Sequence, residues 1–300
     1  MKVWTEHLNR VTCGDREFIE GLQCFFGSSL FGRVFVEGAH FFHGDGANGK
    51  TSTSEAVSMS LGTYSAGFDV DILTDVSRDF QRDVVGLRGA RLATAEELAA
   101  GRRLSTASFK RLTSTKKIHC KPLYHEPVDF EPSHTAIIAT NPLPIVAEFD
   151  DGTWRRLFLW PFNAKIPGNA DIKNYGKFLF ERCGGAILSW AIEGAAMFHK
   201  NGYKLKIPRC VEEATANYRR SQVWVSPFLK SGVVDTSDKN GMTRSRELYH
   251  AYEQWANASG ETVYSERAFA FALRDAGFTD GRDNKSKYWR GISLEEMEVL

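Results

Sequence analysis

The chain has 300 residues, of which 42% are hydrophobic and 25% are charged, and its 38 Lys and Arg residues nearly balance its 37 Asp and Glu residues. These proportions are typical of a globular protein and exclude a fully disordered chain, and no stretch approaches the roughly 20 apolar residues of a membrane helix. A net charge of +1 does not indicate nucleic-acid binding, so only local clusters of basic residues can do so.

The five cysteines are odd in number and form no Cys-x-x-Cys pair. This pattern predicts free thiols in a reducing compartment and no zinc site. The first ten residues contain no apolar signal core, so we expect a cytoplasmic protein without membrane association.

The predicted elements of the N-terminal half follow from apolar spacing. Apolar residues from Phe18 to Phe26 recur at intervals of three and four, which predicts an amphipathic helix. The apolar pair Phe41-Phe42 precedes a Gly-rich turn at 44–49. The elements predicted next are a helix over 51–61, a strand over 91–95, a helix over 105–112 with Ser105 as N-cap, a hairpin over 117–131 with its turn near 122–126, and strands over 136–139 and 156–160. Because strands alternate with helices, we predict an α/β fold with a largely parallel sheet covered on both faces.

The C-terminal half is predicted to be mainly helical. Its predicted helices cover 171–200, 211–230, 245–256 and 265–276, and a basic, aromatic stretch follows at 283–294. Two helices followed by a short strand-turn-strand are typical of a winged helix-turn-helix. The alternative is a small helical appendage with no role in DNA binding.

Residues 44–51, with the sequence GDGANGKT, match the phosphate-binding pattern G-x-x-x-x-G-K-[ST] in full. Glycines let backbone N–H groups surround phosphates, and the N-terminus of the following helix favours their negative charge. Lys50 supplies a cation for the outer phosphates, and the Thr51 hydroxyl is a ligand for Mg²⁺. A chance match is the alternative, but the predicted strand and helix fit the motif. The predicted nucleotide-binding residues are Gly44, Asp45, Gly46, Ala47, Asn48, Gly49, Lys50, Thr51 and Ser52.

Hydrolysis needs an acid that holds the metal and a group that orients water. Glu96 and Glu97 follow a predicted buried strand. We predict that Glu96 holds Mg²⁺, directly or through water, and that Glu97 positions the attacking water. The alternative is that both only provide a favourable acidic start to the next helix.

Two further polar elements complete the predicted catalytic set. Asn141 follows a predicted strand, where its amide can donate to the γ-phosphate or orient water; the alternative is an ordinary Asn-Pro turn. Arg155 and Arg156 are adjacent. We expect one to stabilise the phosphoryl group bound by a neighbouring subunit and the other to form a salt bridge, and the sequence does not choose between them.

The stretch from Gly101 to His125 contains no acidic residue. Its seven Lys and Arg residues are Arg102, Arg103, Lys110, Arg111, Lys116, Lys117 and Lys121. Such a local charge is typical of a surface that binds phosphates, although a solvated basic face is the alternative. The residues predicted to contact DNA are Lys117, His119, Lys121, Tyr124 and His125, with Tyr124 stacking on a base.

The motifs at 44–51, 96–97, 140–141 and 154–156 together resemble the superfamily 3 helicases, most closely the C-terminal helicase part of phage and plasmid primase–helicases and the related poxvirus primase–helicase. This resemblance implies an AAA+-like ATPase core that uses ATP and Mg²⁺, assembly into a ring that is usually a hexamer, and translocation along single-stranded DNA. It also implies a primase–polymerase domain or partner on the N-terminal side, and the host cytoplasm as location for a viral chain.

The resemblance is weaker at the predicted DNA-binding residues. Family members often carry Gly-Gly-Asp where this chain has Ser114-Thr115-Lys116, Arg in place of Lys121 and Lys in place of His125. These departures leave the predicted ATPase centre intact.

The sequence therefore predicts an ATP-dependent DNA helicase that acts on single-stranded and forked duplex DNA in phage or plasmid replication. Its predicted parts are a helical segment over 1–36, a P-loop ATPase core over 37–165, a helical lid or linker over 166–230 and a winged-helix-like domain over 231–300. The alternatives are a nucleotide-regulated protein that binds replication origins and an ATPase that loads or packages DNA without unwinding it. A small-molecule kinase is disfavoured by the basic hairpin and the Trp-Arg-Arg element.

Overall fold

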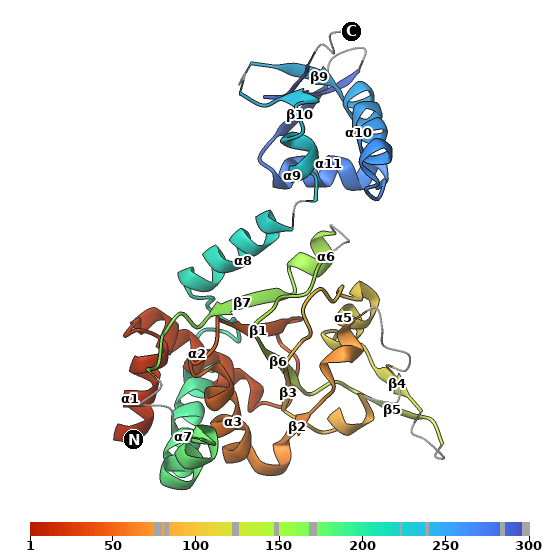
Figure 1. Ribbon diagram of the computed structural model, residues 1–300. Helices are drawn as coiled ribbons and strands as arrows, with labels where there is room; N and C mark the ends of the chain where they lie inside the picture. The colour runs from red at the N-terminus through yellow and green to blue at the C-terminus, as the bar shows by residue number, and fades with distance from the viewer. Residues whose placement is uncertain are drawn as a thin grey trace. The chain divides into compact units, whose positions relative to one another are not determined.

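The computed structural model describes residues 1–74, 80, 84–121, 126–146, 150–167, 173–222, 224–237, 240–282 and 286–295 (Figure 1). The chain divides into two compact units. The first contains Met1–Ala147 and Asp151–Ala216, and the second contains Glu148–Asp150 and Asn217–Leu300. No helix among the described residues is both long enough and apolar enough to cross a membrane.

A five-stranded sheet forms the centre of the first unit. Its strands are β1 (Ala39–His43), β2 (Ser65–Gly67), β3 (Leu92–Glu96), β6 (Thr135–Thr140) and β7 (Leu157–Pro161). They lie in the order β2-β3-β6-β1-β7, and every neighbouring pair is parallel. The predicted parallel α/β sheet is confirmed. β2 was missed because its three residues are too few for a periodic pattern.

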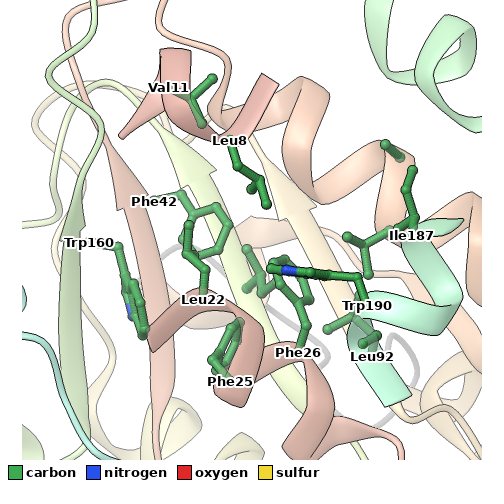
Figure 2. Packing of buried hydrophobic residues seen from close by; sticks show 14 of the residues in the cluster. Leu8, Val11, Leu22, Phe25, Phe26, Phe42, Leu92, Trp160, Ile187 and Trp190 are labelled. Carbon is green, nitrogen blue, oxygen red and sulfur yellow. The ribbon is translucent and has the colours of Figure 1, made fainter. Parts of the chain in front are cut away.

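Four helices pack on one face of this sheet: α1 (Lys2–Val11), α2 (Arg16–Ser29), α3 (Lys50–Leu61) and α7 (Tyr175–Lys200). Figure 2 shows Phe25 and Phe26 of α2 between Phe42 and Trp160 of the sheet and Trp190 of α7. Trp160 is fully buried, and its indole Nε1 donates to His40 Nδ1 over 2.9 Å. This aromatic layer fixes the position of β1, and with it the loop that follows β1.

Helix α5 (Thr106–Leu112) packs on the other face through Phe109, whose ring centroid lies 6.4 Å from that of Phe41. The predicted N-cap is confirmed, because the Ser105 side chain accepts a hydrogen bond from Ser108 N. The short helix α6 (Asp151–Trp154) precedes β7, and single 3₁₀ turns η1 (Gly62–Tyr64), η2 (Val70–Leu73) and η3 (Val84–Leu87) connect other elements.

The predicted hairpin is present as strands β4 (Ile118–Cys120) and β5 (Val128–Phe130), which pair antiparallel. Ile118 lies opposite Phe130. The predicted turn at 122–126 and its contact residues Tyr124 and His125 fall on a segment of which only residue 126 is described.

The predicted helix over 211–230 is wrong, because two helices occupy this stretch: α8 (Arg209–Ser221) and α9 (Ser226–Leu229). Pro227 lies in the first turn of α9. Proline lacks the N–H group that a helix interior needs and is tolerated only in a first turn, so it starts a new helix here.

Among its described residues, the second unit combines three whole helices, the first of which is α9, with small antiparallel sheets. Its elements are β8 (Val234–Asp235), β9 (Met242–Arg244), α10 (Ser245–Ser259), α11 (Glu266–Asp275), β10 (Thr279–Arg282), β11 (Lys287–Arg290) and β12 (Ser293–Leu294). The three longer strands form a sheet in the order β10-β11-β9, and β12 pairs with β8. Tyr252, Phe228, Phe269 and Trp289 form the centre of its core. The helices predicted at 245–256 and 265–276 are confirmed, whereas β9 was not predicted.

Candidate functional site

The phosphate loop and three of the predicted catalytic residues, Glu96, Glu97 and Asn141, lie at the carboxyl ends of three adjacent parallel strands. His43 of β1 is paired with Thr140 of β6, and Glu96 of β3 is paired with Ala139. The segments that follow these strands therefore start side by side. The structure brings together the phosphate loop, the Glu96-Glu97 pair and Asn141 at one edge of the sheet.

The phosphate loop follows β1 directly and is closely packed. A Cβ atom on Gly44 would lie 2.0 Å from Asn48 Nδ2, and one on Gly49 would lie 2.4 Å from Val11 Cγ1. Gly49 also has a φ of 81°, a conformation that favours glycine. The chain after β7 closes over the loop, since Ile166 N donates to Ala47 O over 2.9 Å. The loop is a preformed backbone cradle at the N-terminus of α3, which is the geometry that suits phosphate groups.

Lys50 lies inside this cradle and is only 7% exposed. Its Nζ donates to Gly44 O over 3.1 Å, to Asn48 Oδ1 over 3.3 Å, and to Asn141 Oδ1. Burial lowers the pKa of Lys50, and the nearby Asp45 carboxylate opposes this shift in part. A desolvated ammonium held by neutral oxygens is a good partner for an anion, so the position of Lys50 fits phosphate oxygens.

The two predicted acids are exposed side chains at this edge. Glu97 has a positive φ of 59°. Its N–H donates to Ala139 O over 3.1 Å, so the backbone hydrogen bonds between β3 and β6 continue one residue past Glu96, the last residue of β3. The pKa of Glu96 is raised by burial and by the neighbouring carboxylates of Glu55 and Glu97. The carboxylates of Glu55 and Glu97 thus disfavour the ionised form of Glu96, and a bound cation would relieve this repulsion.

Sequence reasoning missed Glu55. The signal was available, since Glu55 lies four residues after Thr51 in α3 and therefore on the same helix face. Its carboxylate reaches α7, where a Cβ on Gly176 would lie 2.3 Å from Glu55 Oε2.

The donor set at this edge fits Mg²⁺. Thr51 and Ser52 lie half-buried in the first turn of α3, and the Glu96 carboxylate is near the same helix. No group of three or more His, Cys, Asp or Glu residues suited to a metal occurs within the described ranges. Mg²⁺ is usually held by one or two carboxylates together with hydroxyl, water and phosphate oxygens, so this small set suits a metal that arrives with a nucleotide.

Arg155 and Arg156 lie at the opposite edge of the sheet. They precede β7, which runs parallel to β1, and Ala39 N donates to Arg156 O over 2.8 Å at the amino end of β1. The five residues of β1 separate this point from the phosphate loop, a span of about 16 Å at the usual rise of a strand. The structure therefore separates the arginine pair from the phosphate loop of the same chain.

The two arginines differ in their surroundings. Arg156 is 11% exposed, forms an ion pair with Glu37 at 2.5 Å and donates to Gly152 O over 2.7 Å. Arg155 is exposed to solvent. Glu37 was not predicted as a site residue, because a single glutamate before a strand carries no sequence signal.

A basic cavity of 590 Å³ lies beside the arginine pair. Its lining residues are Glu37, Lys110, Arg111, Ser114, Lys116, Lys117, Ile118, His119, Arg155 and Arg156. Six of them are Lys or Arg, and the one carboxylate, Glu37, is already paired with Arg156. His119 Nδ1 lies 2.5 Å from Asp129 Oδ1, across the hairpin formed by β4 and β5. Lys117 and His119, both predicted DNA contacts, share this cavity with Arg155, whereas Lys121 does not line it.

The comparisons with known proteins agree with the resemblance drawn from the motifs. The chain is 30% identical over 155 residues to "Putative helicase L207/L206" of Acanthamoeba polyphaga mimivirus, a match that covers 51% of this chain and 16% of that protein. It is 27% identical over 235 residues to "Putative primase C962R" of African swine fever virus (isolate Pig/Kenya/KEN-50/1950), covering 72% of this chain and 24% of that protein. It is 21% identical over 245 residues to "Putative helicase 184R" of Invertebrate iridescent virus 6, covering 71% of this chain and 25% of that protein. The chain thus spans between about one-sixth and one-quarter of these relatives.

Among solved structures, the chain is similar to the apo structure of the NrS-1 C terminal region (305-718), with a TM-score of 0.53 and 13% sequence identity over 98% of this chain and 76% of that one. A second structure of that region, its A form, gives a TM-score of 0.52. At this identity the likeness concerns the fold. No family model matches the chain. By its motifs and its viral relatives together, the chain resembles primase–helicases and is similar to proteins of large DNA viruses that carry primase and helicase names.

Proposed function

We propose that this chain is the ATP-dependent motor of a DNA replication protein, and that it hydrolyses MgATP in a ring of identical subunits to move along single-stranded DNA. The observation that carries the proposal is the separation of the phosphate loop and the arginine pair at opposite edges of one sheet. In a ring, one copy presents its arginine edge to the phosphate edge of the next, and only then is each nucleotide site complete.

The chemistry at the phosphate edge follows from the residues assembled there. The backbone of 44–49 and Lys50 bind the β- and γ-phosphates, and Thr51 and Glu96 hold Mg²⁺. The ion supplies charge neutralisation for the transferring phosphoryl group. Glu97 orients the attacking water. We assign the γ-phosphate or that water to the Asn141 amide, a role supported by the hydrogen bond from Lys50 to Asn141 Oδ1.

We assign the trans-acting role to Arg155. Arg156 is engaged by Glu37 and by a backbone carbonyl, whereas Arg155 is exposed and free to reach a neighbouring molecule. An arginine in this role stabilises the negative charge that develops on the phosphoryl oxygens.

The basic cavity supports DNA binding beside the hairpin. An excess of cations over carboxylates favours a polyanion whatever its sequence, as movement along single-stranded DNA requires. We place Lys117 and His119 in this contact, with Lys121 on the adjoining strand connection. Tyr124 and His125, at the predicted hairpin turn, remain part of the proposal.

The elements of the second unit support a winged helix-turn-helix, since α10 and α11 are followed by the β10–β11 pair. Two grooves of this unit have nearly balanced charge. One is lined by Arg244, Arg246 and Lys287 with Glu247, Glu253 and Glu266, and the other by Arg267, Arg274 and Lys287 with Glu266 and Asp280. This balance gives less support to an origin-binding protein than the basic cavity gives to a motor.

The relatives are four to six times longer than the part that this chain matches. We therefore propose that the motor acts together with a primase–polymerase domain or partner, with helical segment 1–36, ATPase core 37–165, helical linker 166–230 and winged-helix domain 231–300 as its own parts.

Strand separation on a forked DNA substrate tests the proposal. We expect unwinding that requires ATP and Mg²⁺ and is abolished in Lys50→Ala, while Lys2→Ala, with its exposed side chain, behaves like wild type. ATP hydrolysis without strand separation at any protein concentration would instead identify a loading or packaging ATPase. No ATP hydrolysis with DNA present would overturn both.

A further inference from the structure

Glu37 joins three functional parts of the first unit. It lies two residues before β1, the strand that leads into the phosphate loop. Its Oε2 pairs with Arg156, next to the proposed trans-acting Arg155. Its Oε1 accepts from Thr115 N over 3.2 Å and from Thr115 Oγ1 over 3.3 Å. Thr115 lies three residues before β4 of the hairpin.

The carboxylate uses both of its oxygens, one for each neighbour. The Glu37 side chain is 32% exposed and that of Arg156 is 11% exposed, so the ion pair is shielded more than a typical surface pair. The hydrogen bonds from Thr115 and the charge of Arg156 lower the pKa of Glu37 against the opposing effect of burial. The carboxylate is thus ionised and held at this position at neutral pH.

The contact on the arginine side is incomplete. The Nε of Arg156 is buried and has no hydrogen-bond partner among the residues that the structure describes. A buried donor without an acceptor disfavours the arrangement that contains it, so a rearrangement that gives Arg156 an acceptor is favoured once neighbouring groups move. Because Arg155 and Arg156 are adjacent in the chain, a backbone shift that carries Arg155 toward a neighbour's phosphate moves Arg156 with it.

From this geometry we propose that Glu37 is a positioning residue that couples the state of the neighbour's nucleotide to the hairpin that holds DNA. Movement of Arg155 toward the neighbour's nucleotide changes the ion pair between Arg156 and Glu37. The Glu37 carboxylate then shifts and alters its hydrogen bonds with Thr115, which precedes the hairpin. This inference rests on the proposed function, since it needs both the trans-acting arginine and the DNA-holding hairpin.

The test measures coupling rather than affinity. The dissociation constant of a fluorescent oligothymidylate is determined for the full chain with and without a non-hydrolysable ATP analogue, and the ratio of the two constants is the coupling factor. We expect a wild-type ratio of about five or more in either direction, and a ratio near one for Glu37→Gln. A local loss or gain of DNA affinity alters both constants equally and leaves the ratio unchanged.

Two further test variants and one control variant keep the experiment decisive. Thr115→Val removes the exposed hydroxyl that donates to Glu37 and should reduce the ratio in part, even if Glu37→Gln fails to fold. Arg156→Gln added to Glu37→Gln should change the ratio no further, because both act through one contact. Glu193→Gln is the matched control and should keep the wild-type ratio, because Glu193 is an exposed residue of α7 that accepts a hydrogen bond from Gln23 Nε2.

The outcomes separate the two proposals. A wild-type chain that neither hydrolyses ATP nor binds the oligonucleotide contradicts the proposed function itself. If the wild type does both, then a wild-type ratio of one, or an unchanged ratio in folded Glu37→Gln and Thr115→Val, overturns the coupling role of Glu37 and leaves the motor proposal intact.

Discussion

Lys50 is the residue on which nucleotide turnover should depend most. Its ammonium is buried among neutral oxygens of the phosphate cradle, and no other described cation occupies the phosphate loop. We expect Lys50→Ala to lower ATP turnover by about 10²–10³-fold, the usual effect of removing a group that stabilises the transition state. Steady-state phosphate release measures this, and a folded variant with wild-type turnover would contradict the site.

Glu96 gives a prediction for stability against pH. Burial and the carboxylates of Glu55 and Glu97 raise its pKa in the folded chain. The folded chain therefore binds a proton more readily than the unfolded chain does, so ionised Glu96 destabilises the fold once the pH exceeds the ordinary glutamate pKa of about 4.3.

We expect Glu96→Gln to raise the melting temperature at pH 7 and to lose this advantage as the pH falls toward 4, while ATP turnover is lost throughout. Thermal melts at several pH values check this, with Glu193→Gln as the control. A variant less stable than wild type at pH 7 would show that the carboxylates do not repel one another.

Sequence reasoning at this scale predicts residues that belong to ordered motifs and misses residues that are defined by contacts. Gly44–Thr51 could be predicted because the chemistry of phosphate binding fixes residue type and spacing together. Glu37 could not, because it is defined by its contacts with Arg156 and Thr115, from segments far apart in the chain. The helical spacing of Glu55 from Thr51 was visible in the sequence, but its approach to Glu96 was not. The same contacts distinguish Arg155 from Arg156, which the sequence left open.

Helix α5 is the element that connects the core to the basic cavity. Phe109 on one side of the helix is fully buried under β1, while Lys110 and Arg111 line the cavity. Ser105 caps the helix by accepting from Ser108 N. We expect Ser105→Ala to lower the free energy of unfolding by about 1 kcal/mol, measured by urea denaturation. If the free energies of unfolding of Ser105→Ala and wild type agree within error, the cap contributes nothing to stability.

The segment that leads into the hairpin gives a prediction for DNA binding. Lys116 and Lys117 are exposed side chains that line the cavity. The double variant Lys116→Ala/Lys117→Ala should reduce the slope of log affinity for single-stranded DNA against log salt by about 0.7 for each phosphate that is no longer neutralised. Lys177→Ala, an exposed lysine on α7, should keep the slope. An unchanged slope in the double variant would place the DNA elsewhere.

Elements with long apolar patterns were predicted well, and short or interrupted ones were not. The strands β1, β3, β6 and β7 are buried runs bounded by polar turns, which the sequence displays directly. The helix predicted over 211–230 failed because apolar spacing continues across Pro227, although proline starts a new helix there. Strand β9 has three residues, two of them exposed, and forms only because β11 lies beside it.

At the scale of the whole molecule, the sheet explains why, in our proposal, one chain alone does not hold a complete nucleotide site. Parallel strands carry all their carboxyl ends to one edge, and this topology places the phosphate loop there and the arginine pair at the other. The order of motifs along the chain does not reveal this separation. It follows from the pairing of β7 with β1 in parallel register, which only the folded structure provides.

Mixing two inactive variants tests this central claim most directly. Lys50→Ala chains lack a working phosphate site but keep Arg155, and Arg155→Ala chains keep the phosphate site but lack the arginine. The account predicts that each variant alone is inactive and that mixed assemblies regain ATP turnover, with a maximum at intermediate ratios, because some interfaces then unite both intact edges. If no ratio restores turnover in assemblies shown by native mass measurement to contain both variants, Arg155 does not act on a neighbour's nucleotide.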